Sequence, residues 1–477
     1  MGRCQLTMLT RADAEAVHGA SVRILETTGA LVRSAEARSL LAAAGAKVVE
    51  TDTRVFFPEG LVADALKSAP RSFVLGARDP KRDLRIPADG LPYVCTDGFP
   101  AKIWDHAAQL PRPSTRADLE RWATLADAVD AVDFLWPSVT PTDLPARAQF
   151  VGGLRTSYEH TSKHVQYQAI RGDEALAEIE MARAVAGGDE ENRKRPHFSS
   201  VHCIVAPLQY DAGPTDGVIA FARAGIPVVH MTMVTPGITG PTTLAGSLAL
   251  ANAEVLAATA ISQAAARGSP VFYCFVCAPL DMKSGGFYSG SPEYGLLSVA
   301  GAEMARHYGL PSMMGGMGNT AKAPGMQLGY EKALTTAVVA LAGCDLLTGL
   351  GGLNDSLFVG MEQLLIDAEI WEHIERTAAG VDVSDAEIAL DVIEAVGPRG
   401  QFLNQPHTLA NFRRLFMSRL SDRSSYEAWA AAGRKDMYEA AHAEVERILA
   451  AHRPAPVSAD VRRRLEAIDA GVLAAAA

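Results

Sequence analysis

Several residue types are scarce in this chain of 477 residues, and each scarcity excludes a class of protein. Six cysteines are too few for the disulfide framework of a small secreted domain, so we expect reduced thiols. Basic residues number 44 against 55 acidic ones, which gives a net charge of 44 − 55 = −11. An acidic chain whose basic runs are short binds phosphate backbones poorly, so we expect no nucleic acid partner.

Long uninterrupted apolar runs are also missing. The most apolar long segments, 244–266 and 335–353, are broken by charged side chains such as Glu254 and Asp345, and we expect neither to span a bilayer. The first residues carry acidic side chains where a secretory signal would need an apolar stretch. The sequence therefore predicts a cytoplasmic protein with no membrane association.

Common catalytic signatures are absent as well. The sequence contains no Walker A phosphate loop, HExxH zinc motif, GxSxG nucleophile elbow or EF-hand loop, which removes the most frequent NTPase, hydrolase and calcium-binding classes. Cys274 and Cys277 form a CxxC spacing, but it lies in a predicted strand, where residues three apart face opposite sides. We predict no metal site.

Short β-rich runs alternate with longer helical patterns through the centre of the chain. The candidate strands are Phe134–Val139, His164–Ile170, His197–Val205, Pro227–Val234, Pro270–Cys277, Pro311–Met317 and Asp345–Leu350. The clearest helical patterns between them are Thr215–Ala224, Thr242–Arg267, Pro292–His307 and Gln327–Ala342. This alternation predicts parallel strands with right-handed crossovers. A (β/α)8 barrel fits best, with Gln401–Leu403 as a guess for the eighth strand, and an open doubly wound sheet is the alternative.

The predicted fold class is thus α/β, a TIM barrel carrying an extension at each end. Residues 1–114 are expected to form an N-terminal cap of helices followed by short β-hairpins, one of them at Tyr93–Cys95. Residues 115–355 are expected to form the barrel core. Residues 356–477 read as a helical C-terminal extension that completes the barrel domain and packs on it, with helices at Glu362–Ala379, Asp385–Val396, Leu409–Leu420 and Arg434–Ala451.

Active sites of such barrels lie at the carboxyl ends of the strands and in the loops that follow. Side chains that we expect there, or in the N-terminal hairpins above them, are Tyr93, Phe99, Trp136, Gln168, His202, His230, Tyr273, Phe275 and Asn319. His202 and His230 face the barrel mouth if their apolar neighbours meet the surrounding helices; a hydrogen-bonded core role is the other interpretation. The aromatic rings are candidates for a cage around a quaternary ammonium group, with core packing as the alternative.

Glycine-rich loops follow three of the predicted strands. Gly316, Gly318 and Gly351 are our candidate cofactor-binding positions, because glycine lets a ligand approach the backbone and exposes N–H groups. Gly316, Gly318 and Ala321 match a dinucleotide fingerprint only weakly, since no clear acidic residue follows about 20 positions on.

Three segments carry a resemblance to a known family. The run Pro241–Leu256 (PTTLAGSLALANAEVL), with Gly268–Val271 and Gln327–Lys332, resembles the trimethylamine methyltransferase family, and the similarity continues to Gln405–Leu409. The resemblance implies a barrel enzyme that moves a methyl group from an amine to the Co(I) of a cobalamin, which a separate corrinoid protein carries.

The archetypal trimethylamine enzymes of that family contain pyrrolysine. This chain has only standard residues, with Leu328 or a neighbour in the corresponding region near Gln327–Tyr330. It therefore resembles the non-pyrrolysine branch, the glycine betaine:corrinoid methyltransferases, whose characterised members demethylate glycine betaine or related quaternary amines. His202, His230, Gln327 and Tyr330 are the catalytic candidates under this interpretation.

A quaternary amine suits a chain without a special residue. Its nitrogen already bears a full positive charge, so the methyl group can be attacked directly and a neutral tertiary amine leaves without a general acid. A substrate carboxylate would need a donor such as His202, His230 or a loop N–H. Two alternatives remain open: a barrel lyase or decarboxylase that uses the two histidines as acid and base, and a non-catalytic betaine-binding or corrinoid-docking protein. We also expect a homo-oligomer.

Overall fold

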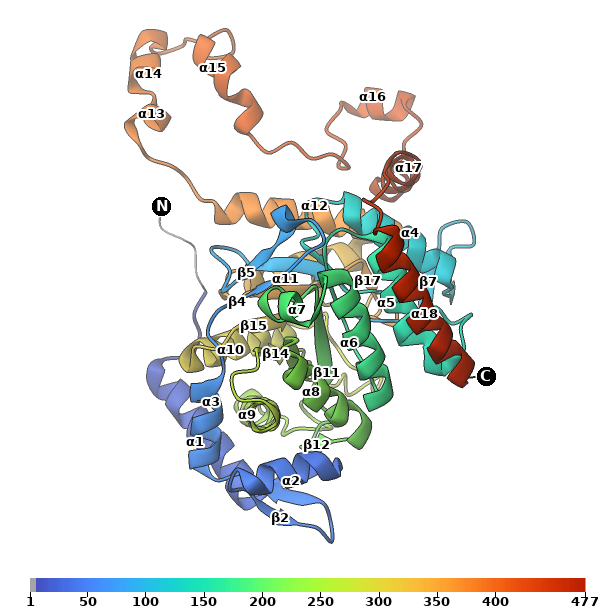
Figure 1. Cartoon of the computed structure of the whole chain (residues 1–477). Helices are drawn as coiled ribbons and strands as arrows, with labels where there is room; N and C mark the ends of the chain where they lie inside the picture. The colour runs from blue at the N-terminus through green and yellow to red at the C-terminus, as the bar shows by residue number, and fades with distance from the viewer. Residues whose placement is uncertain (1–5, 477) are drawn as a thin grey trace.

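A closed barrel of parallel strands forms the centre of the computed structural model, which describes residues 6–476 (Figure 1). The strands follow in the order β6-β9-β10-β11-β13-β14-β15-β16, and β16 pairs back with β6. Their bounds are β6 Tyr93–Thr96, β9 Phe134–Leu135, β10 His164–Tyr167, β11 Phe198–Cys203, β13 Val228–Thr232, β14 Val271–Phe275, β15 Ser312–Gly315 and β16 Leu346–Leu350. The predicted barrel is confirmed, and closure of the ring excludes the open doubly wound sheet.

Each barrel strand is followed by a helix on the outside of the ring. These helices are α4 Arg116–Ala128, α5 Gln149–His160, α6 Gly172–Ala186, α8 Ala212–Ala224, α9 Leu244–Ala265, α10 Pro292–Tyr308, α11 Met326–Ala340 and α12 Met361–Ala378, with the short α7 Asp189–Lys194 after α6. Local signals fix several of their ends. The Thr115 side chain and Asp118 form a capping box at the start of α4, and Gly225 and Gly309 end α8 and α10 in the left-handed conformation.

The seven strands expected from the sequence are present, but the eighth is not where we expected it. It is β6, which the hairpin prediction assigned to the cap, and the guess at Gln401–Leu403 is wrong, because those residues contain no strand. Between β6 and its helix α4 the chain forms the antiparallel pair β7 Lys102–Asp105 and β8 Leu110–Pro113. That insertion hides the βα pattern of the first barrel unit and makes the region resemble a series of hairpins.

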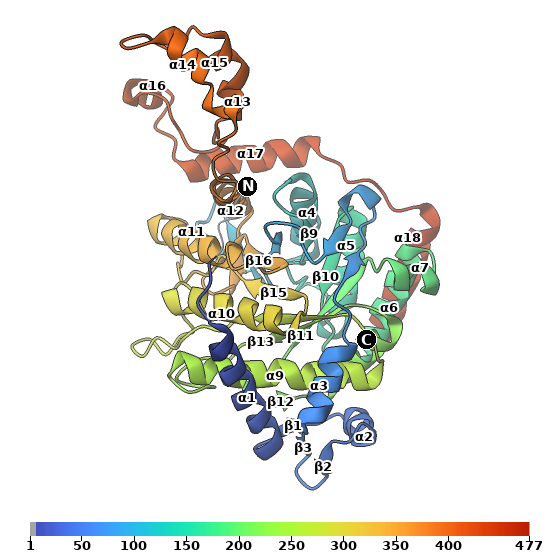
Figure 2. The ribbon, with the colours of Figure 1, turned by 90° about the vertical axis from the view of Figure 1, so that its left-hand side faces the viewer.

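The N-terminal cap covers one side of the barrel. It contains α1 Arg11–Thr27, α2 Ala35–Ala43 and α3 Glu59–Ser68, the strands β1 Ala30–Val32, β2 Lys47–Val49 and β3 Arg54–Phe56, and the hairpin β4 Phe73–Leu75 with β5 Leu84–Ile86. β12 Gln209–Tyr210, from a barrel loop, extends the cap sheet beside β1. The cap helices α1, α2 and α3 all pack against α9 (Figure 2).

This packing explains the composition of α9. Among the described residues α9 is the one helix long and apolar enough to cross a membrane, yet 78% of its most apolar window is buried inside the fold. A helix that is apolar on all sides is covered on all sides, here by the barrel on one face and the cap on the other. The hydroxyl of Ser21 on α1 donates to the carbonyl of Ala249, and the Asn252 amide donates to Ser21.

A second small sheet lies beside the end of the barrel where the strands finish. It joins β17 Gly352–Leu353, β18 Phe358–Val359, β7 and β8, so that the segments after β16 and after β6 pair with each other. Trp104 of β7 stacks on Phe358 of β18, with ring centroids 5.9 Å apart. This sheet holds the loops after the two adjoining barrel strands in place.

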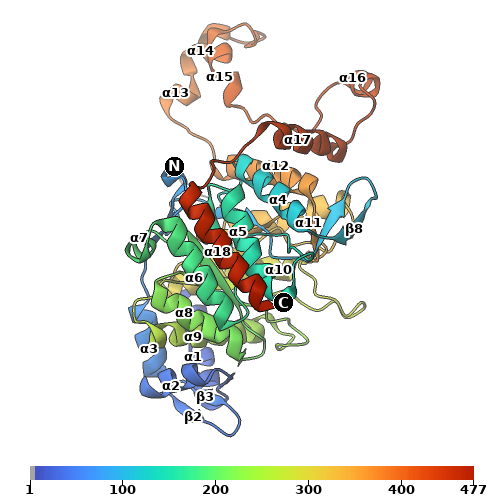
Figure 3. The same cartoon turned by 45° about the vertical axis from the view of Figure 1, so that its right-hand side comes forward.

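The C-terminal extension is only partly packed on the barrel. α17 Met437–Ala451 lies against α12 and α4, and α18 Ala459–Ala476 lies against α5 and α6 (Figure 3). Residues 380–417, here called the C-terminal arm, instead project from the molecule (Figure 1), and of them only Ala389 is buried. The arm holds α13 Asp385–Ile388, α14 Leu390–Val396 and α15 Pro406–Asn411, with a 3-10 turn at Phe412–Arg414 where the sequence suggested one helix over Leu409–Leu420.

The chain returns to the body of the molecule directly after the arm. The Glu369 carboxylate of α12 accepts hydrogen bonds from the hydroxyls of Ser418 and Ser421 and from the backbone N–H groups of residues 419–421. These bonds lower the pKa of Glu369 to about 2, although burial opposes them. A second excursion then carries α16 Tyr426–Ala431 outward before α17 begins. The remaining short 3-10 turns are Pro80–Arg82 and Ala146–Ala148.

Candidate functional site

A cavity of about 360 Å³ opens at the carboxyl ends of the barrel strands. Its lining comes from the ends of β6, β9, β11, β13, β14, β15 and β16 and from the loops that follow them. The lining residues are Asp97, Gly98, Phe99, Pro100, Trp136, Cys203, Met231, Met233, Val276, Phe287, Ser289, Tyr294, Gly316, Met317, Gly318, Asn319, Thr348, Asp355 and Ser356. This is the place where barrel enzymes carry their active sites, and the volume suits a small molecule.

Aromatic rings and sulfur-containing side chains contribute eight of the nineteen lining residues. Phe99 and Trp136 lie side by side with ring centroids 5.8 Å apart and planes inclined by 52°. Phe287 and Tyr294 add rings from the segment between β14 and α10 and from α10 itself. Aromatic faces carry a negative quadrupole that attracts cations, and no lysine, arginine or histidine is among the lining residues. The wall is therefore built for a cation rather than an anion.

The Asp97 carboxylate is the charged group of this cavity that has no partner. Asp97 directly follows β6, and the residue is 7% exposed. Its backbone is fixed, since its N–H donates to the Leu350 carbonyl and its carbonyl accepts from the Ser138 hydroxyl. No hydrogen bond or ion pair to the side-chain oxygens is found within residues 6–476. A nearly buried carboxylate left unpaired is costly unless a ligand supplies the positive charge.

Asp355, the second carboxylate of the lining, is in a different situation. The backbone N–H and the hydroxyl of Ser289 both donate to its carboxylate, at 3.0 and 2.6 Å. Burial raises the pKa of Asp355 above its ordinary value despite these bonds. Asp355 thus has partners of its own and joins the loop after β16 to the segment before α10.

His202 and His230 lie beside the cavity but do not line it. Their Nδ1 atoms are 3.3 Å apart, and His230 Nε2 lies 2.9 Å from the hydroxyl of Ser262 on helix α9. Burial lowers the pKa of His202 to about 4 and that of His230 well below its ordinary value. Both rings are therefore neutral near pH 7 and hold no proton to donate as imidazolium.

The expectation that these histidines face the barrel mouth is wrong. The residue that follows each histidine faces the cavity instead. Met231 and Cys203 face the cavity, and the histidines face the helix layer. Both sides of a parallel barrel strand are buried, so alternation of polar and apolar residues does not reveal which side is the interior. The helix layer accepts polar residues here because α9 offers hydrogen-bond partners such as Ser262 and Glu254. Burial raises the pKa of Glu254 to about 7.

The other aromatic candidates on β14 also belong to the helix layer. The Tyr273 hydroxyl donates to Asn252 of α9, and Phe275 packs against Gly301 of α10. Gln168 is buried next to Cys203 and Tyr93 at the start of β6 is half-buried, and neither residue lines the cavity. Of the predicted substrate-binding residues the cavity brings together Phe99, Trp136 and Asn319. The amide of Asn319 is already used, since it donates to the carbonyls of Met317 and Gly352.

The catalytic candidates on helix α11 lie outside the cavity. The candidate glycines are explained by close packing. Gln327 is exposed and donates to Thr320 and Glu331, and Tyr330 is 58% exposed; neither lines the cavity. Gly316 and Gly318 line it, and a Cβ at either position would meet the side chain of Leu347 or the backbone of Ser289. Gly351, at a positive φ of 84°, packs against Trp122. Close packing accounts for these glycines without a cofactor.

Asp97 is the principal residue that the sequence reading missed. A signal existed, because Tyr93–Thr96 followed by Asp97 and Gly98 has the same form as the other strand ends, a short β run that closes on a polar residue. The prediction of a cap hairpin at Tyr93–Cys95 conceals this signal, because it removes the strand from the barrel. Ser289, Tyr294 and Asp355 come from loop and helix positions that periodicity does not connect to the barrel mouth.

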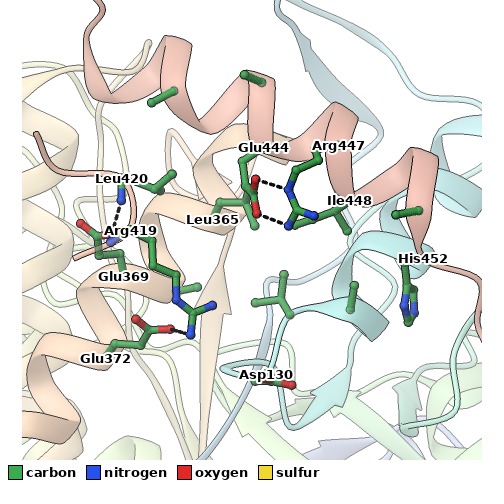
Figure 4. A pocket seen from close by; sticks show the side chains of 16 residues that line it. Asp130, Leu365, Glu369, Glu372, Arg419, Leu420, Glu444, Arg447, Ile448 and His452 are labelled. Carbon is green, nitrogen blue, oxygen red and sulfur yellow. Dashed lines mark hydrogen bonds and ion pairs between the residues drawn. The ribbon is translucent and has the colours of Figure 1, made fainter. Parts of the chain in front are cut away.

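A larger cavity, of about 700 Å³, lies outside the barrel where α17 crosses α12 and the end of α4 (Figure 4). Its charged groups are mostly paired with each other: Arg447 with Glu444, Arg419 with Glu372, and His452 with Asp127 of α4. Side chains on neighbouring helices that satisfy one another in this way indicate helix packing with solvent between the helices. We therefore do not assign a function to this cavity.

A group of metal-ligating side chains occurs near the same helices. One ligand atom from each of His106, Glu362 and His442 lies within 4.8 Å of the others. The two imidazole rings are stacked with centroids 3.6 Å apart and planes 2° from parallel. Their in-plane lone pairs therefore run side by side and do not converge on one ion. The geometry shows two rings that share the Glu362 carboxylate, with His442 Nδ1 at 2.7 Å.

Comparisons with known proteins agree with this architecture. A family model described as trimethylamine methyltransferase matches residues 2–470. The trimethylamine methyltransferase of Desulfitobacterium hafniense is 35% identical over 95% of this chain and 91% of that protein, and that of Methanosarcina barkeri is 34% identical over 97% and 94%. The glycine betaine methyltransferase of Desulfitobacterium hafniense is 32% identical over 96% of each chain.

The same fold occurs in a solved structure. The monomethylamine methyltransferase of Methanosarcina barkeri superposes with a TM-score of 0.51 at 11% identity, over 91% of this chain and 92% of that one. At this identity the similarity concerns the fold alone.

Proposed function

The chain belongs to the trimethylamine methyltransferase family, and from that premise we propose that it transfers a methyl group from a quaternary amine to the Co(I) of a cobalamin carried by a partner corrinoid protein. Glycine betaine and similar betaines are the substrates that the relatives and the missing pyrrolysine suggest first. The observation that carries the proposal is the cavity at the barrel mouth, which combines aromatic rings with an unpaired carboxylate and contains no cationic side chain. A permanent cation is the ligand that this combination favours.

The reaction needs little acid–base chemistry from the protein. The N–CH3 bond breaks with its electron pair retained by nitrogen, a neutral tertiary amine leaves, and the methyl carbon bonds to the cobalt of the partner. The residues of this chain then have three tasks: to hold the cation, to direct one methyl group toward the opening, and to exclude water. Phe99, Trp136 and Tyr294 supply the rigid wall for the first two tasks, and Met231, Met233 and Met317 make much of the remainder apolar.

We assign Asp97 to substrate binding and His202 and His230 to support of the wall. The histidine pair fixes β11 and β13 to each other and to α9, so it positions Cys203 and Met231 without touching substrate. This arrangement disfavours the lyase or decarboxylase alternative, because the two histidines lie outside the cavity and do not reach a ligand within it. A cognate corrinoid protein, a homo-oligomer and a cytoplasmic location complete the proposal.

The test is methylation of cobalt. The purified chain is mixed with a reduced corrinoid protein and a panel of quaternary amines, and the change in cobalt absorbance is followed. We expect methylation with at least one quaternary amine and none when the chain is omitted. If the whole panel leaves cobalt unmethylated while ligands bind tightly, the chain is a binding or docking protein. Consumption of substrate in the absence of any corrinoid would instead support the lyase.

A further inference from the structure

We propose that the substrate of this chain is a quaternary ammonium cation that carries no carboxylate, and that Asp97 is its counter-ion. The inference rests on the proposed methyl transfer from a quaternary amine. Within that class it selects cations without a carboxylate over the betaines that the relatives suggest first. Among the quaternary amines, betaines are zwitterions with a carboxylate near the nitrogen, whereas choline-like and tetraalkyl cations bear positive charge alone. The lining of the cavity distinguishes the two classes.

The first argument is the sign of the charges around the ligand. The lining contains two carboxylates, of Asp97 and Asp355, and no lysine, arginine or histidine. A betaine bound there would bring a third carboxylate into a cavity of about 360 Å³, too small to keep the carboxylates far apart. Repulsion between like charges grows as water is excluded and the effective dielectric constant falls. A ligand of net positive charge is attracted under the same conditions.

The second argument is the supply of hydrogen-bond donors. A betaine carboxylate would require donors to replace its water, yet most donor side chains of the lining are already engaged. Within residues 6–476 the donors without a partner are the Trp136 indole N–H and the Ser356 hydroxyl, and both are uncharged. The Ser289 hydroxyl donates to Asp355, the Thr348 hydroxyl to the Thr96 carbonyl, and the Asn319 amide to two backbone carbonyls. The unsatisfied charged group of the cavity is an acceptor, Asp97.

The third argument is that the backbone at Gly352 lies directly against the Asp97 carboxylate. A side-chain carbon at Gly352 would clash with the Asp97 carboxylate, so the absence of a side chain at Gly352 makes room for it. Gly352 begins β17, which pairs with β18 in the second small sheet, here called the rim sheet, formed by β17, β18, β7 and β8. The carboxylate is therefore held between a rigid strand end and a rigid sheet, with the rings of Phe99 and Trp136 on neighbouring parts of the wall.

Charge development during the reaction gives Asp97 a characteristic kinetic signature. The positive charge on nitrogen disappears as the methyl group leaves, so an ion pair with Asp97 stabilises the bound substrate more than the transition state. Removing the carboxylate should weaken binding and raise KM while kcat stays unchanged or rises. A residue that merely supported the fold would lower kcat and thermal stability together.

The experiment measures binding by calorimetry, without corrinoid, for choline, its neutral carbon isostere 3,3-dimethylbutanol, and glycine betaine. The proteins are the wild type, Asp97→Asn and, as a matched control, Asp130→Asn, whose carboxylate belongs to the cavity between α12 and α17. We expect the wild type to bind choline at least tenfold more tightly than either other ligand. Asp97→Asn should lose at least tenfold in choline affinity without losing betaine affinity, and Asp130→Asn should behave as the wild type.

A second variant covers the case in which Asp97→Asn folds poorly. Gly352→Ala places a methyl group where the carboxylate lies and should weaken choline binding while the Asp97 side chain is still present. The proposal is overturned if the wild type binds betaine as tightly as choline, or if neither variant changes choline affinity. Choline that binds in this way without methylating cobalt would contradict the proposed function alone. Betaine that methylates cobalt while choline fails to bind would contradict the present inference alone.

Discussion

At the scale of single residues, the proposed site combines one carboxylate that has no partner, that of Asp97, with the aromatic side chains of the cavity wall. Asp97 has no hydrogen-bond partner for its carboxylate within residues 6–476, whereas Asp355 on the same wall has two from Ser289. The nearby buried charge of Lys332 shows the usual arrangement, since its ammonium group pairs with Asp367 inside the helix layer. Because the Asp97 carboxylate lacks such a partner, it is the position that we propose for the cationic ligand.

The aromatic wall can be tested by shortening one ring. Trp136→Leu should raise the Kd for choline by about 2- to 30-fold, because a cation over an indole face gains about 0.5–2 kcal/mol. Trp136→Phe should recover most of that loss. Trp104→Leu is the control, since Trp104 stacks on Phe358 in the rim sheet and does not line the cavity. Equal Kd values for the wild type and Trp136→Leu would show that the ligand does not contact this ring.

The buried histidine predicts how stability depends on pH. Burial lowers the pKa of His202 to about 4 from an ordinary value of 6.5, so the unfolded chain binds this proton more tightly than the folded chain. The contribution of this buried neutral ring to the free energy of unfolding is complete above pH 6.5. It decreases as the pH falls from 6.5 to 4, by at most about 3 kcal/mol. Denaturant unfolding of His202→Asn should show a weaker loss over this window than the wild type. Identical slopes for the two proteins would place the ring in contact with solvent.

At the scale of elements, the regular βα units could be predicted from the sequence. The insertions that interrupt a βα unit could not. The seven strands from β9 to β16 were evident because each short β run is followed by a long helical pattern. β6 was not, since β7 and β8 intervene before α4 and give the segment the appearance of hairpins. Because β6 was predicted to belong to the cap, the sequence did not place Asp97 at the barrel mouth. The prediction of which side of a strand faces the cavity was wrong for a separate reason. His202 and Met231 lie on strands that are buried on both sides.

The C-terminal arm shows a different limit of sequence reading. Its short helical patterns are real, but apolar side chains in amphipathic positions did not lead to packing: Leu403, Leu409 and Leu415 are 83%, 76% and 68% exposed. Helices of four to seven residues gain little stability on their own, and tertiary contacts decide where they lie. Periodicity shows that a segment has an apolar face and does not show what meets it.

This exposure predicts early cleavage of the arm by protease. Trypsin should cut first after Arg399, whose surroundings have almost no buried contacts, and mass spectrometry of the fragments identifies the site. The nicked chain should keep its affinity for choline, because the arm contributes no residue to the cavity. Resistance of Arg399 under conditions where the barrel is cleaved would show that another chain covers the arm in solution.

At the scale of the whole molecule, the fold separates the tasks of catalysis. The cap covers α9 on one side of the barrel, α17 and α18 cover the outer helices, and the carboxyl ends of the strands hold the cavity (Figures 1 and 3). In the proposed reaction, the methyl acceptor carried by another protein reaches the substrate at that opening. Under this proposal the barrel is a rigid holder that presents a methyl group, and the partner supplies the cobalt.

The most direct measurement is a crystal structure of the chain with arsenocholine, the arsenic analogue of choline, located by its anomalous scattering. We predict an arsenic peak in the cavity at the barrel mouth, with the rings of Phe99 and Trp136 and the Asp97 carboxylate as its nearest neighbours. An arsenic peak elsewhere, such as between α12 and α17, or an empty cavity at saturating ligand, would contradict the assignment of this cavity as the cation site.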